Sequence, residues 1–402
     1  MKVAVVGAGI SGLGAAHLLS RVHDVEVFET GVRAGGHTRT VRLHGLALDT
    51  GFLVHNERNY PLLTRLFREL GVATQESEMS FSVACPCGLE YSGRRPFAQP
   101  SRVGDRSFHR LLWEIGRWLR TARRSLDELD CDAISLGRYL DERGYSLSFR
   151  RHFLVPLTAA LWSTAPGRAL EYPAAAAIRF FDNHGMLGFR RFRWRTVTGG
   201  AGTYVDELSR RLGPRLRAGL GVRSVRRDSD GVEIRTVDDA SRRFDAVVVA
   251  THADQALRLL EDPSPDERRL LGAFAYTRND VVLHTDSSHL PATHAARASW
   301  NYRVGDDGRP TVTYYLNRLQ RLKTRRDWCV TLNGDVADEH VVDRTVFEHP
   351  LFTVDTLAAQ RELPRLAGTR RTWYAGAYHG YGFHEDGLAS GVRAAEALGA
   401  AW

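Results

Sequence analysis

Three glycines near the N-terminus have the spacing of a phosphate-binding turn. Gly7, Gly9 and Gly12 form the pattern G-x-G-x-x-G between an apolar run at 3–6 and apolar residues at helical spacing over 13–19. In such a turn the first glycine permits a tight bend, the second lets the backbone approach a pyrophosphate, and the third lets helix and strand pack closely. Free N–H groups at the helix start favour the phosphate charge. The residues expected to hold a dinucleotide here are Gly7, Gly9, Ile10, Ser11 and Gly12.

A carboxylate follows this turn at the end of the next expected strand. Val25, Val27 and Phe28 form that strand, and Glu29 ends it, followed by Thr30. In this position the Glu29 side chain can accept hydrogen bonds from an adenosine ribose. The complete order of strand, turn, helix, strand and acid is a stronger signal than the glycines alone. The alternatives are a glycine-rich turn without a ligand and a solvated strand end for Glu29.

A second pair of glycines decides which dinucleotide is expected. Residues 33–40 have the pattern R-x-G-G-H-x-x-T, and residues 49–51 follow as a strand that leads into a turn. An ordinary dehydrogenase has no need of this pair, whereas FAD extends past the first helix and requires another close backbone approach. The alternative is two unrelated turns. The residues assigned to FAD in this segment are Arg33, Gly35, Gly36, His37, Thr38, Thr40, Thr50, Gly51 and Phe52.

Two distant segments complete the expected cofactor site. The segments 222–225 and 244–251 are predicted to be strands that return to the same sheet, and 374–376 closes another strand. Residues 382–388 open a final helix, whose N–H groups can stabilise the negative charge of a reduced flavin ring. For the two acids of this helix start, helix caps are favoured over an acid/base pair. The residues assigned here are Val222, Ala250, Thr251, Gly376, Glu385, Asp386, Gly387 and Leu388.

Histidine and tyrosine side chains are the candidates for catalysis. Histidine titrates near neutral pH, which suits a general acid or base. His384 lies beside the expected flavin-facing helix start, His284 lies on an alternating strand, and His55 follows the flavin approach. Tyr378 and Tyr381 are candidates to form a wall of the flavin ring or to donate hydrogen bonds. The alternatives are a satisfied core position for the histidines and a loop cap for His55.

The sequence predicts no metal site. The four cysteines are Cys85, Cys87, Cys131 and Cys329, and no two of them have C-x-x-C spacing. The histidines have no clustered acid partners at metal-ligand spacing. Cys85 and Cys87 flank a proline and are expected to form a turn, with redox sensing as the alternative.

Composition is that of a soluble globular enzyme with more than one domain. The chain has 402 residues, of which 43% are hydrophobic and 25% charged. The net charge of +8 raises the question of nucleic-acid binding. We discount it because Lys2 and Lys323 are the only lysines among 55 basic residues, and the arginines are interleaved with acids along the chain. A weak attraction to anionic membrane surfaces remains open.

No targeting or membrane-spanning segment is expected. The first strand begins at residue 2, which leaves no room for a signal peptide. No apolar run reaches the roughly 18 residues of a spanning helix. We therefore expect a cytoplasmic protein with reduced thiols. A stripe of apolar residues over 108–126, surrounded by arginines, is either a core helix or an interfacial helix that contacts a membrane peripherally. The oligomeric state stays open.

The expected fold is α/β, with a discontinuous Rossmann-type FAD-binding domain of the glutathione-reductase-like kind and an α+β substrate domain. A doubly wound sheet suits the first domain, and a mixed or antiparallel sheet with a helical insertion suits the second. Apolar and polar residues alternate over 276–334, as in antiparallel strands that floor a cavity, and 106–164 has helical spacing. The FAD-binding domain is assigned to 1–75, 197–275 and 355–402, and the substrate domain to 76–196 and 276–354.

With these motifs the chain resembles the superfamily of flavin-dependent amine oxidases, protoporphyrinogen oxidases and phytoene desaturases. More narrowly it resembles a bacterial subgroup of FAD-dependent oxidoreductases whose neighbouring genes often encode cyclopropane-fatty-acid-synthase-like methyltransferases. That resemblance implies a fatty-acyl or other lipid substrate and a flavin that accepts a hydride. The segments that carry it are DTGFLVHNERNYPLL (49–63), VTGGAGTYVDEL (197–208), VVLHTDSSHLP (281–291), ASWNYR (298–303), VTYYLNRLQ (312–320) and AGAYHGYGFHEDGLASG (375–391).

The chain departs from the superfamily pattern at positions that bear on the reaction. Several members carry a lysine that reaches the flavin through water, and here the comparable strand offers Asn279 and Asp280. That departure disfavours amine oxidation. The aromatic pair that encloses amines has only Tyr315 and Tyr378 as candidates. No cysteine occupies the flavin-linking position, so FAD is expected to be non-covalent.

The activity expected from the sequence is FAD-dependent removal of hydride from a C–H bond of an apolar substrate, as in desaturation or dehydrogenation. The alternatives are a flavin amine oxidase and a redox-neutral isomerase that requires reduced flavin transiently. The expected partner is a hydrophobic small molecule or lipid, and no nucleic acid.

Overall fold

The apolar run predicted near the N-terminus forms the central strand of a five-stranded sheet in the computed structural model. All pairings in this sheet are parallel. Its central strands are buried on both faces, which explains why they contain consecutive valines rather than an alternating pattern. In spatial order the strands are β19 (Thr372–Tyr374), β13 (Ala246–Val249), β1 (Lys2–Val6), β2 (Asp24–Glu29) and β9 (Leu216–Ala218).

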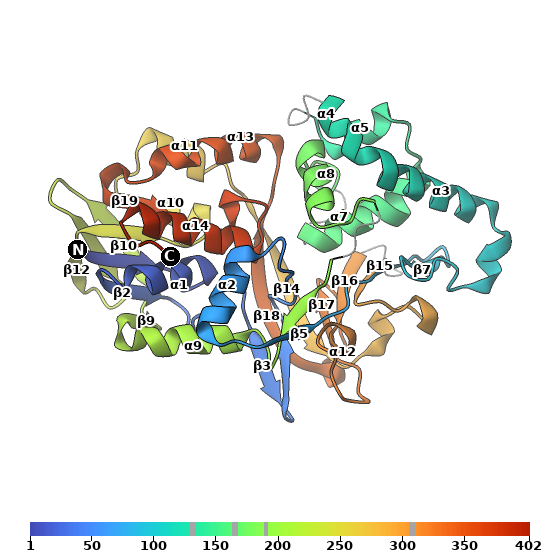
Figure 1. Cartoon of the computed structure of the whole chain (residues 1–402), viewed down its shortest axis with the longest axis horizontal. Helices are drawn as coiled ribbons and strands as arrows, with labels where there is room; N and C mark the ends of the chain where they lie inside the picture. Colours follow the sequence, from blue (N-terminus) through green and yellow to red (C-terminus); the bar gives the residue numbers. More distant parts are fainter. Residues whose placement is uncertain (129–133, 163–167, 189–191, 305–309) are drawn as a thin grey trace.

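Helices cover both faces of this sheet, as in a doubly wound fold. The structure describes residues 1–128, 134–162, 168–188, 192–304 and 310–402, and the left lobe in Figure 1 contains this sheet and both termini. Each face has its own hydrophobic core. The core of one face contains α1 (Ile10–Leu19), α2 (Pro61–Leu70), α9 (Gly202–Leu212) and α14 (His384–Ala397), and that of the other contains α10 (Ala253–Leu259), α11 (Pro265–Leu271) and α13 (Val354–Glu362).

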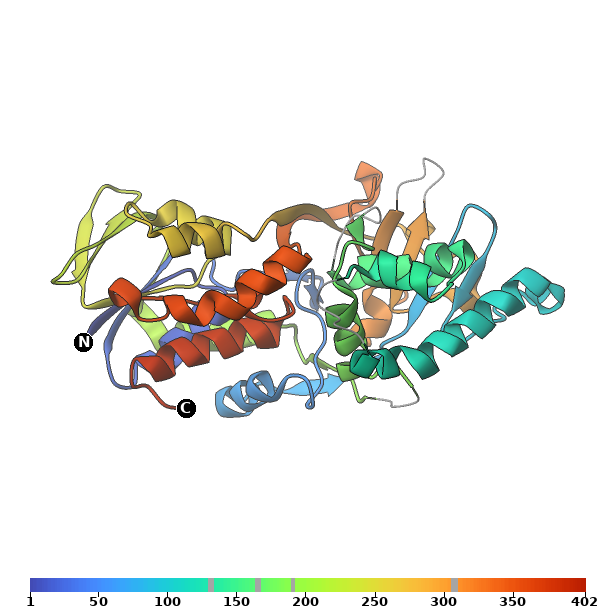
Figure 2. The same ribbon diagram turned by 90° about the horizontal axis from the view of Figure 1, so that it is seen from above.

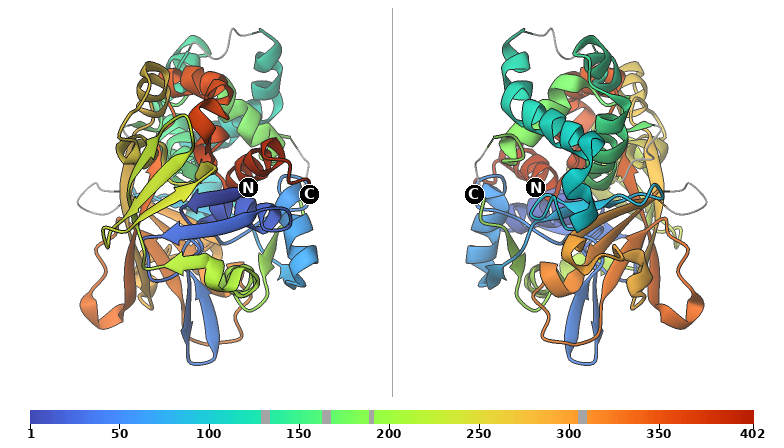
Figure 3. Two further views of the ribbon diagram at one scale, coloured as in Figure 1. Left: turned by 90° about the vertical axis from the view of Figure 1, so that its left-hand side faces the viewer. Right: turned by 90° about the vertical axis from the view of Figure 1, so that its right-hand side faces the viewer.

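The segment 222–225 does form a strand, but the predicted sheet was wrong. It begins β10, which pairs antiparallel with its neighbour in a separate three-stranded sheet beside the parallel one (Figure 3). Arg223 and Arg226 of this strand are exposed. A strand in a parallel sheet with helices on both faces could not expose them. The order of this sheet is β10 (Val222–Arg227), β11 (Val232–Thr236) and β12 (Ser241–Phe244).

The second lobe is built on a seven-stranded mixed sheet, as predicted. Apart from one parallel pair, β15 with β6, its neighbours pair antiparallel. The long strands β14 and β18 run between the two lobes (Figure 1). The spatial order is β18 (Val341–Pro350), β14 (Tyr276–His284), β17 (Cys329–Leu332), β16 (Pro310–Tyr315), β15 (Trp300–Val304), β6 (Phe81–Ala84) and β7 (Glu90–Ser92).

The helical insertion lies at the end of the molecule opposite the termini (Figure 2). Its long helix α3 buries Phe108, Leu111 and Trp118 but leaves Trp113 58% exposed. Among the described residues no helix is long and apolar enough to cross a bilayer. The helices of this lobe are α3 (Arg106–Thr121), α4 (Ser125–Glu128), α5 (Leu136–Glu142), α6 (Leu147–Phe149), α7 (Val155–Trp162), α8 (Ala174–Asn183) and α12 (Leu316–Leu319).

Two small ribbons connect the lobes, and one of them carries a buried acid. Asp49 accepts hydrogen bonds from Thr40 Oγ1 (2.5 Å), the Ala201 amide (2.9 Å) and Gln320 Nε2 (2.9 Å). These donors come from the same ribbon, the residue before α9, and the residue after α12. Burial raises the pKa of Asp49 to about 7. The ribbons pair β3 (Thr40–Leu43) with β4 (Leu46–Asp49), and β5 (Thr74–Glu76) with β8 (Arg195–Val197).

Replacing Asp49 by alanine is expected to lower the free energy of unfolding by about 3 kcal/mol, because two buried donors and the half-buried Thr40 hydroxyl would lose their acceptor. Asp49→Asn keeps one acceptor oxygen and should cost less. Urea unfolding followed by fluorescence measures both. Equal midpoints for the wild type and Asp49→Ala would show that this carboxyl does not hold the three segments together.

Candidate active site

The three glycines of the first turn have three different steric roles. Gly7 has φ +100°, and a Cβ there would lie 2.6 Å from the carbonyl oxygen of Ala250. A Cβ on Gly12 would lie 1.9 Å from the oxygen of Gly7, so this glycine is required by helix packing. A Cβ on Gly9 has only the Cα of Gly36 within 4.0 Å. The surroundings of Gly9 are therefore open, which leaves room for a ligand.

The second glycine pair packs against the first turn. Gly36 has φ +55°, and a Cβ there would lie 3.1 Å from the Cα of Gly9. The Gly35 amide donates to the Ala8 oxygen (2.8 Å). A Cβ on Gly51 would lie 1.8 Å from the His37 oxygen. These contacts show that the two motifs, separate in the sequence, form one continuous backbone cradle.

The helix start in this cradle can receive phosphates, and the acid beside it can receive a ribose. No side chain caps the N-terminus of α1. Its first N–H groups are therefore available to an anion. Glu29 Oε2 accepts from the Ala8 amide and Oε1 from the Gly31 amide, both at 2.8 Å. These bonds fix the carboxylate at the edge of the cradle.

One cavity of about 730 Å³ extends from this cradle into the second lobe. Most of the residues that the sequence assigned to the cofactor line it. A continuous cavity with glycines at one end fits an extended dinucleotide whose ring reaches the other lobe. The predicted cofactor residues that line it are Gly7, Gly9, Ile10, Ser11, Glu29, Thr30, Gly36, His37, Thr50, Gly51, Phe52, Val222, Ala250, Thr251 and Gly376.

The remaining predicted cofactor residues do not line the cavity, and most of them hold its walls together. Thr40 Oγ1 accepts a hydrogen bond from the Gly202 amide (2.8 Å) and donates one to Asp49. Leu388 is fully buried against Gly14, whose Cβ would lie 2.4 Å from Leu388 Cδ1. Arg33 is exposed. The predicted residues outside the lining are Gly12, Arg33, Gly35, Thr38, Thr40, Glu385, Asp386, Gly387 and Leu388.

The two acids at the start of α14 accept hydrogen bonds from amides at helix starts, in agreement with the caps that the sequence favoured over an acid/base pair. Glu385 accepts from the amides of Leu62 (2.8 Å) and Leu63 (3.0 Å) at the start of α2. Asp386 accepts from the Phe383 amide (2.9 Å). Burial raises the pKa of Glu385 to about 7 and that of Asp386 to about 6. Their carboxyls therefore serve helix ends and not the cofactor directly.

The end of the cavity in the second lobe is lined by apolar side chains from several elements. Strand, helix and loop residues all contribute, and both aromatic and aliphatic side chains are present. Glu29 and Glu348 are the only carboxylate residues among the described lining residues, and Glu348 Oε2 lies 3.5 Å from His252 Nδ1. The apolar lining comprises Leu53, Val54, Met79, Leu161, Trp162, Phe180, Met186, Trp194, Val281, Trp300, Tyr314, Leu332, Phe347, Phe352 and Phe383.

His384 lines this cavity as predicted, but its ring is already hydrogen-bonded. Its Nε2 lies 2.8 Å from Thr38 Oγ1 and 2.9 Å from the Tyr204 hydroxyl, and its ring stacks on Phe52 at 4.1 Å. Burial lowers its pKa to about 3, so the imidazole is neutral at pH 7. The structure therefore places His384 where it can contact a ligand as an uncharged ring.

The other two histidine candidates lie outside the lining. His284 is fully buried, with its Nε2 2.6 Å from Thr331 Oγ1 and its ring near His289, which matches the satisfied core position given as the alternative. The His55 ring packs edge-on against Phe67 at 5.2 Å. Burial lowers the pKa of both to about 4.

The tyrosine candidates are part of the walls. Tyr378 lines the cavity, but its ring is 1% exposed and packs against Phe274 in the core behind it. Tyr381 lies edge-on to Phe180 at 5.9 Å and is not among the lining residues. Tyr315 donates to Asp327 (2.6 Å), away from the cavity. These positions do not form an aromatic pair around one point.

Sequence analysis missed His349, which lines the cavity from β18. Its Nδ1 lies 3.0 Å from Asn279 Nδ2 on β14. Asn279 is fully buried, and its amide orientation is fixed because Oδ1 accepts from Asn333 (2.8 Å) and Nδ2 donates to the Thr277 oxygen (3.1 Å). His349 Nδ1 therefore accepts, and its proton lies on Nε2. The sequence contained one indication of this site, because Asn279 stands where several relatives carry a lysine. It did not show which strand pairs with β14, so His349 could not be placed beside Asn279.

His349 belongs to a group of three neutral histidines around the cavity. Its ring lies 5.2 Å from that of His37, which in turn lies 5.9 Å from that of His252. Burial lowers the pKa of His349 to about 3 and that of His37 to about 4. The Nε2–H of His349 has no partner among the residues that the structure describes, so it is available to a ligand.

Comparison with known proteins assigns the family. The model of the flavin containing amine oxidoreductases matches residues 10–294, which include Gly12 of the first turn, the second glycine pair and all of β14. The chain belongs to this family. FAD is its cofactor, as the sequence predicted, and the glycine cradle with its open helix start fits that dinucleotide.

Relatives agree with this amine oxidoreductase assignment. A Mycobacterium tuberculosis protein named as a flavin-containing monoamine oxidase, AofH, is 29% identical over 278 residues, which cover 65% of this chain. The match spans 59% of that protein, less than two thirds of its length.

Solved structures show the same fold. Putrescine oxidase bound to putrescine has a TM-score of 0.74 at 15% identity, with 99% of both chains covered. A fatty acid isomerase from P. acnes that produces CLA has a TM-score of 0.73 at 17% identity and covers 97% of this chain and 96% of its own. The predicted α/β fold with a Rossmann-type FAD part and a second, mixed-sheet part is confirmed. The domain boundaries remain a proposal.

Proposed function

We propose that this protein is an FAD-dependent oxidoreductase that removes hydride from a C–H bond of an apolar, fatty-acyl or lipid, substrate. The observation that carries the proposal is the apolar end of the cavity. Its lining combines aromatic and aliphatic groups, and the two lining carboxylates, Glu29 and Glu348, lie toward the dinucleotide end. A charged substrate would lose its hydration there without gaining a partner. An alkyl chain gains about 0.8 kcal/mol for each methylene buried.

The chain's own residues position the cofactor and exclude water. The glycine cradle and the start of α1 hold the phosphates, Glu29 holds the ribose, and the apolar lining keeps the reacting carbon dry. FAD, when bound, supplies the hydride acceptor. His349 presents an N–H toward the cavity, fixed by Asn279 and Asn333. In this proposal that N–H stabilises negative charge that develops on its ligand.

The other predicted site residues keep narrower roles in this proposal. His384 contacts the ligand as a neutral ring, whereas Tyr378, Tyr381, His55 and His284 support the walls of the site. A lipid substrate also agrees with peripheral membrane contact, for which the exposed Trp113 on α3 is the candidate.

Amine oxidation is the second candidate, and two observations favour it. The family is that of amine oxidoreductases, and the aromatic rings of the cavity can bind a cation through cation–π contacts.

A redox-neutral isomerase is the third candidate, since the match to the fold of the fatty acid isomerase covers nearly the whole chain.

Anaerobic titration of the FAD-loaded protein separates these candidates. Fatty acids of increasing chain length are expected to bleach the flavin absorbance, with the dissociation constant falling about fourfold for each added methylene. The product should have lost two hydrogens by mass spectrometry. Bleaching by hydrophobic amines alone, with ammonia release in air, would select the amine oxidase. A product of unchanged mass, formed only after flavin reduction, would select the isomerase.

A further inference from the structure

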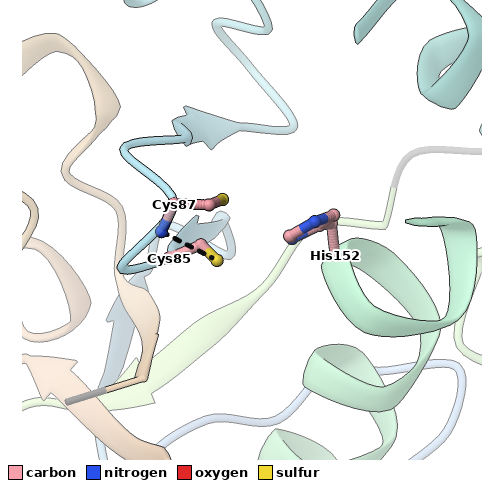
Figure 4. Close-up of side chains that lie close together, drawn as sticks. All are labelled: Cys85, Cys87 and His152. Carbon is pink, nitrogen blue, oxygen red and sulfur yellow. Dashed lines mark hydrogen bonds between the residues drawn. The ribbon is translucent and has the colours of Figure 1, made fainter. Parts of the chain in front are cut away.

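A group of potential metal ligands lies in the second lobe, outside the cavity. Cys85 and Cys87 lie in the turn between β6 and β7, and His152 lies in the π-helical turn Arg150–Leu154 that leads into α7. Their ligand atoms, two sulfurs and one ring nitrogen, all lie within 4.8 Å of one another. Figure 4 shows the His152 ring facing the two cysteines from the opposite element.

The three side chains are free to act as ligands. The cysteines are not in a disulfide, and neither ring nitrogen of His152 has a hydrogen-bond partner among the described residues. The Cys87 amide donates to Cys85 Sγ (3.4 Å), which holds the two cysteines together in one turn. Thiolates and neutral imidazole are the ligands that Zn²⁺ prefers.

The backbone around these ligands is held in place. The Cys85 amide donates to the Leu89 oxygen and the Gly88 amide to the Cys85 oxygen, both at 2.9 Å, so the turn is closed. The Tyr91 hydroxyl donates to the His152 oxygen (2.7 Å), which fixes the helical turn against the hairpin. A tetrahedral zinc ion with Zn–S bonds of about 2.3 Å spaces its ligand atoms about 3.8 Å apart. Small side-chain rotations are therefore sufficient to reach that geometry.

We propose that Cys85, Cys87 and His152 bind a zinc ion, with a water molecule as the fourth ligand on the exposed side of Cys87. The ion joins the edge of the seven-stranded sheet to the helical segment that continues into α7. Leu161 and Trp162 at the end of α7 line the apolar part of the cavity. The site is therefore a structural clamp on one cavity wall, and it is independent of the reaction proposed above.

Sequence spacing could not reveal this site. C-x-C lacks the spacing of common zinc motifs, and His152 is far from both cysteines along the chain. The prediction of no metal rested on that spacing. The fold brings His152 next to the turn that contains Cys85 and Cys87, so three ligands are close enough together to bind a metal ion.

Cobalt binding to the full-length, FAD-loaded protein tests the proposal. After treatment with a chelator and a thiol reductant, the protein is titrated with Co²⁺ and then with Zn²⁺. We expect one Co²⁺ per chain with a thiolate-to-metal charge-transfer band and the visible bands of tetrahedral cobalt, both abolished by stoichiometric Zn²⁺. Difference spectra against the same protein without metal remove the flavin absorbance. Binding without the thiolate band would overturn the proposal.

Matched variants keep the test independent of folding. Cys87 is exposed, so Cys87→Ser should fold normally but lose at least tenfold in Zn²⁺ affinity, measured by competition with a chromogenic zinc indicator. His152→Gln should weaken binding similarly, whereas Cys329→Ser, in a buried strand elsewhere, should bind as the wild type does. Zinc should raise the melting temperature of the wild type but not of Cys87→Ser. Unchanged zinc affinity in Cys87→Ser, or a melting temperature that responds to oxidant instead of zinc, would refute the zinc site.

Discussion

Gly9→Val is expected to give a folded protein that purifies without its yellow cofactor. Gly9 has φ −73° and ψ −177°, which valine adopts readily, and a Cβ there meets no atom closer than 4.0 Å. The same Cβ would occupy the space in which the backbone approaches the pyrophosphate. Losing two charge-assisted hydrogen bonds of about 1.5–3 kcal/mol each corresponds to a hundredfold or greater loss of FAD affinity. Flavin absorbance and isothermal titration of the apoprotein measure it.

Two other glycines provide the controls. Gly93→Val, at a position with nothing within 4 Å of the added Cβ, should keep both the fold and the cofactor. Gly12→Val should unfold or precipitate the protein, because its Cβ would lie 1.9 Å from the Gly7 oxygen. If Gly9→Val bound FAD as tightly as the wild type, the dinucleotide would have to lie elsewhere.

The cofactor half of the site could be predicted because its signals are local. A glycine turn, the strands around it and a terminal acid occur within the first thirty residues, and the turn begins at Gly7, whose φ of +100° few other residues adopt. The second glycine pair meets the first turn through Gly36 and Gly9, as expected for one extended ligand. The parallel sheet follows from the same local pattern, since consecutive valines require burial on both faces.

The catalytic half could not be predicted because it depends on pairing between distant strands. His284 and His349 both lie on strands of the same sheet, and only the register of β14 with β18 places His349 beside the cavity and next to Asn279. A shift of one residue in that register would turn His349 to the other face. Glu385 was similarly ambiguous, because nothing in its own segment reveals that it caps α2.

His349→Ala is expected to retain FAD but to lower the reduction potential of the bound flavin by about 30–65 mV. That range corresponds to the loss of one hydrogen bond of about 1.5–3 kcal/mol to the negative charge of the two-electron-reduced ring. Turnover with the substrate found above should fall by about tenfold or more. The flavin content, the potential against a reference dye and the turnover number are the three measurements. His340→Ala, at an exposed residue that directly precedes the other end of β18, should leave all three unchanged.

Asn279→Asp tests the orientation of the His349 proton directly. A carboxylate at this position would accept from Nδ1, so the ring proton would move from Nε2 to Nδ1 and the cavity would lose its donor. The potential should then fall as far as in His349→Ala, although the His349 ring is still present. Asn279→Gln, which keeps an amide donor, should recover part of the loss. A potential that drops in His349→Ala but stays at the wild-type value in Asn279→Asp would mean that the ring acts by filling space, because only a hydrogen-bonding role depends on which nitrogen carries the proton.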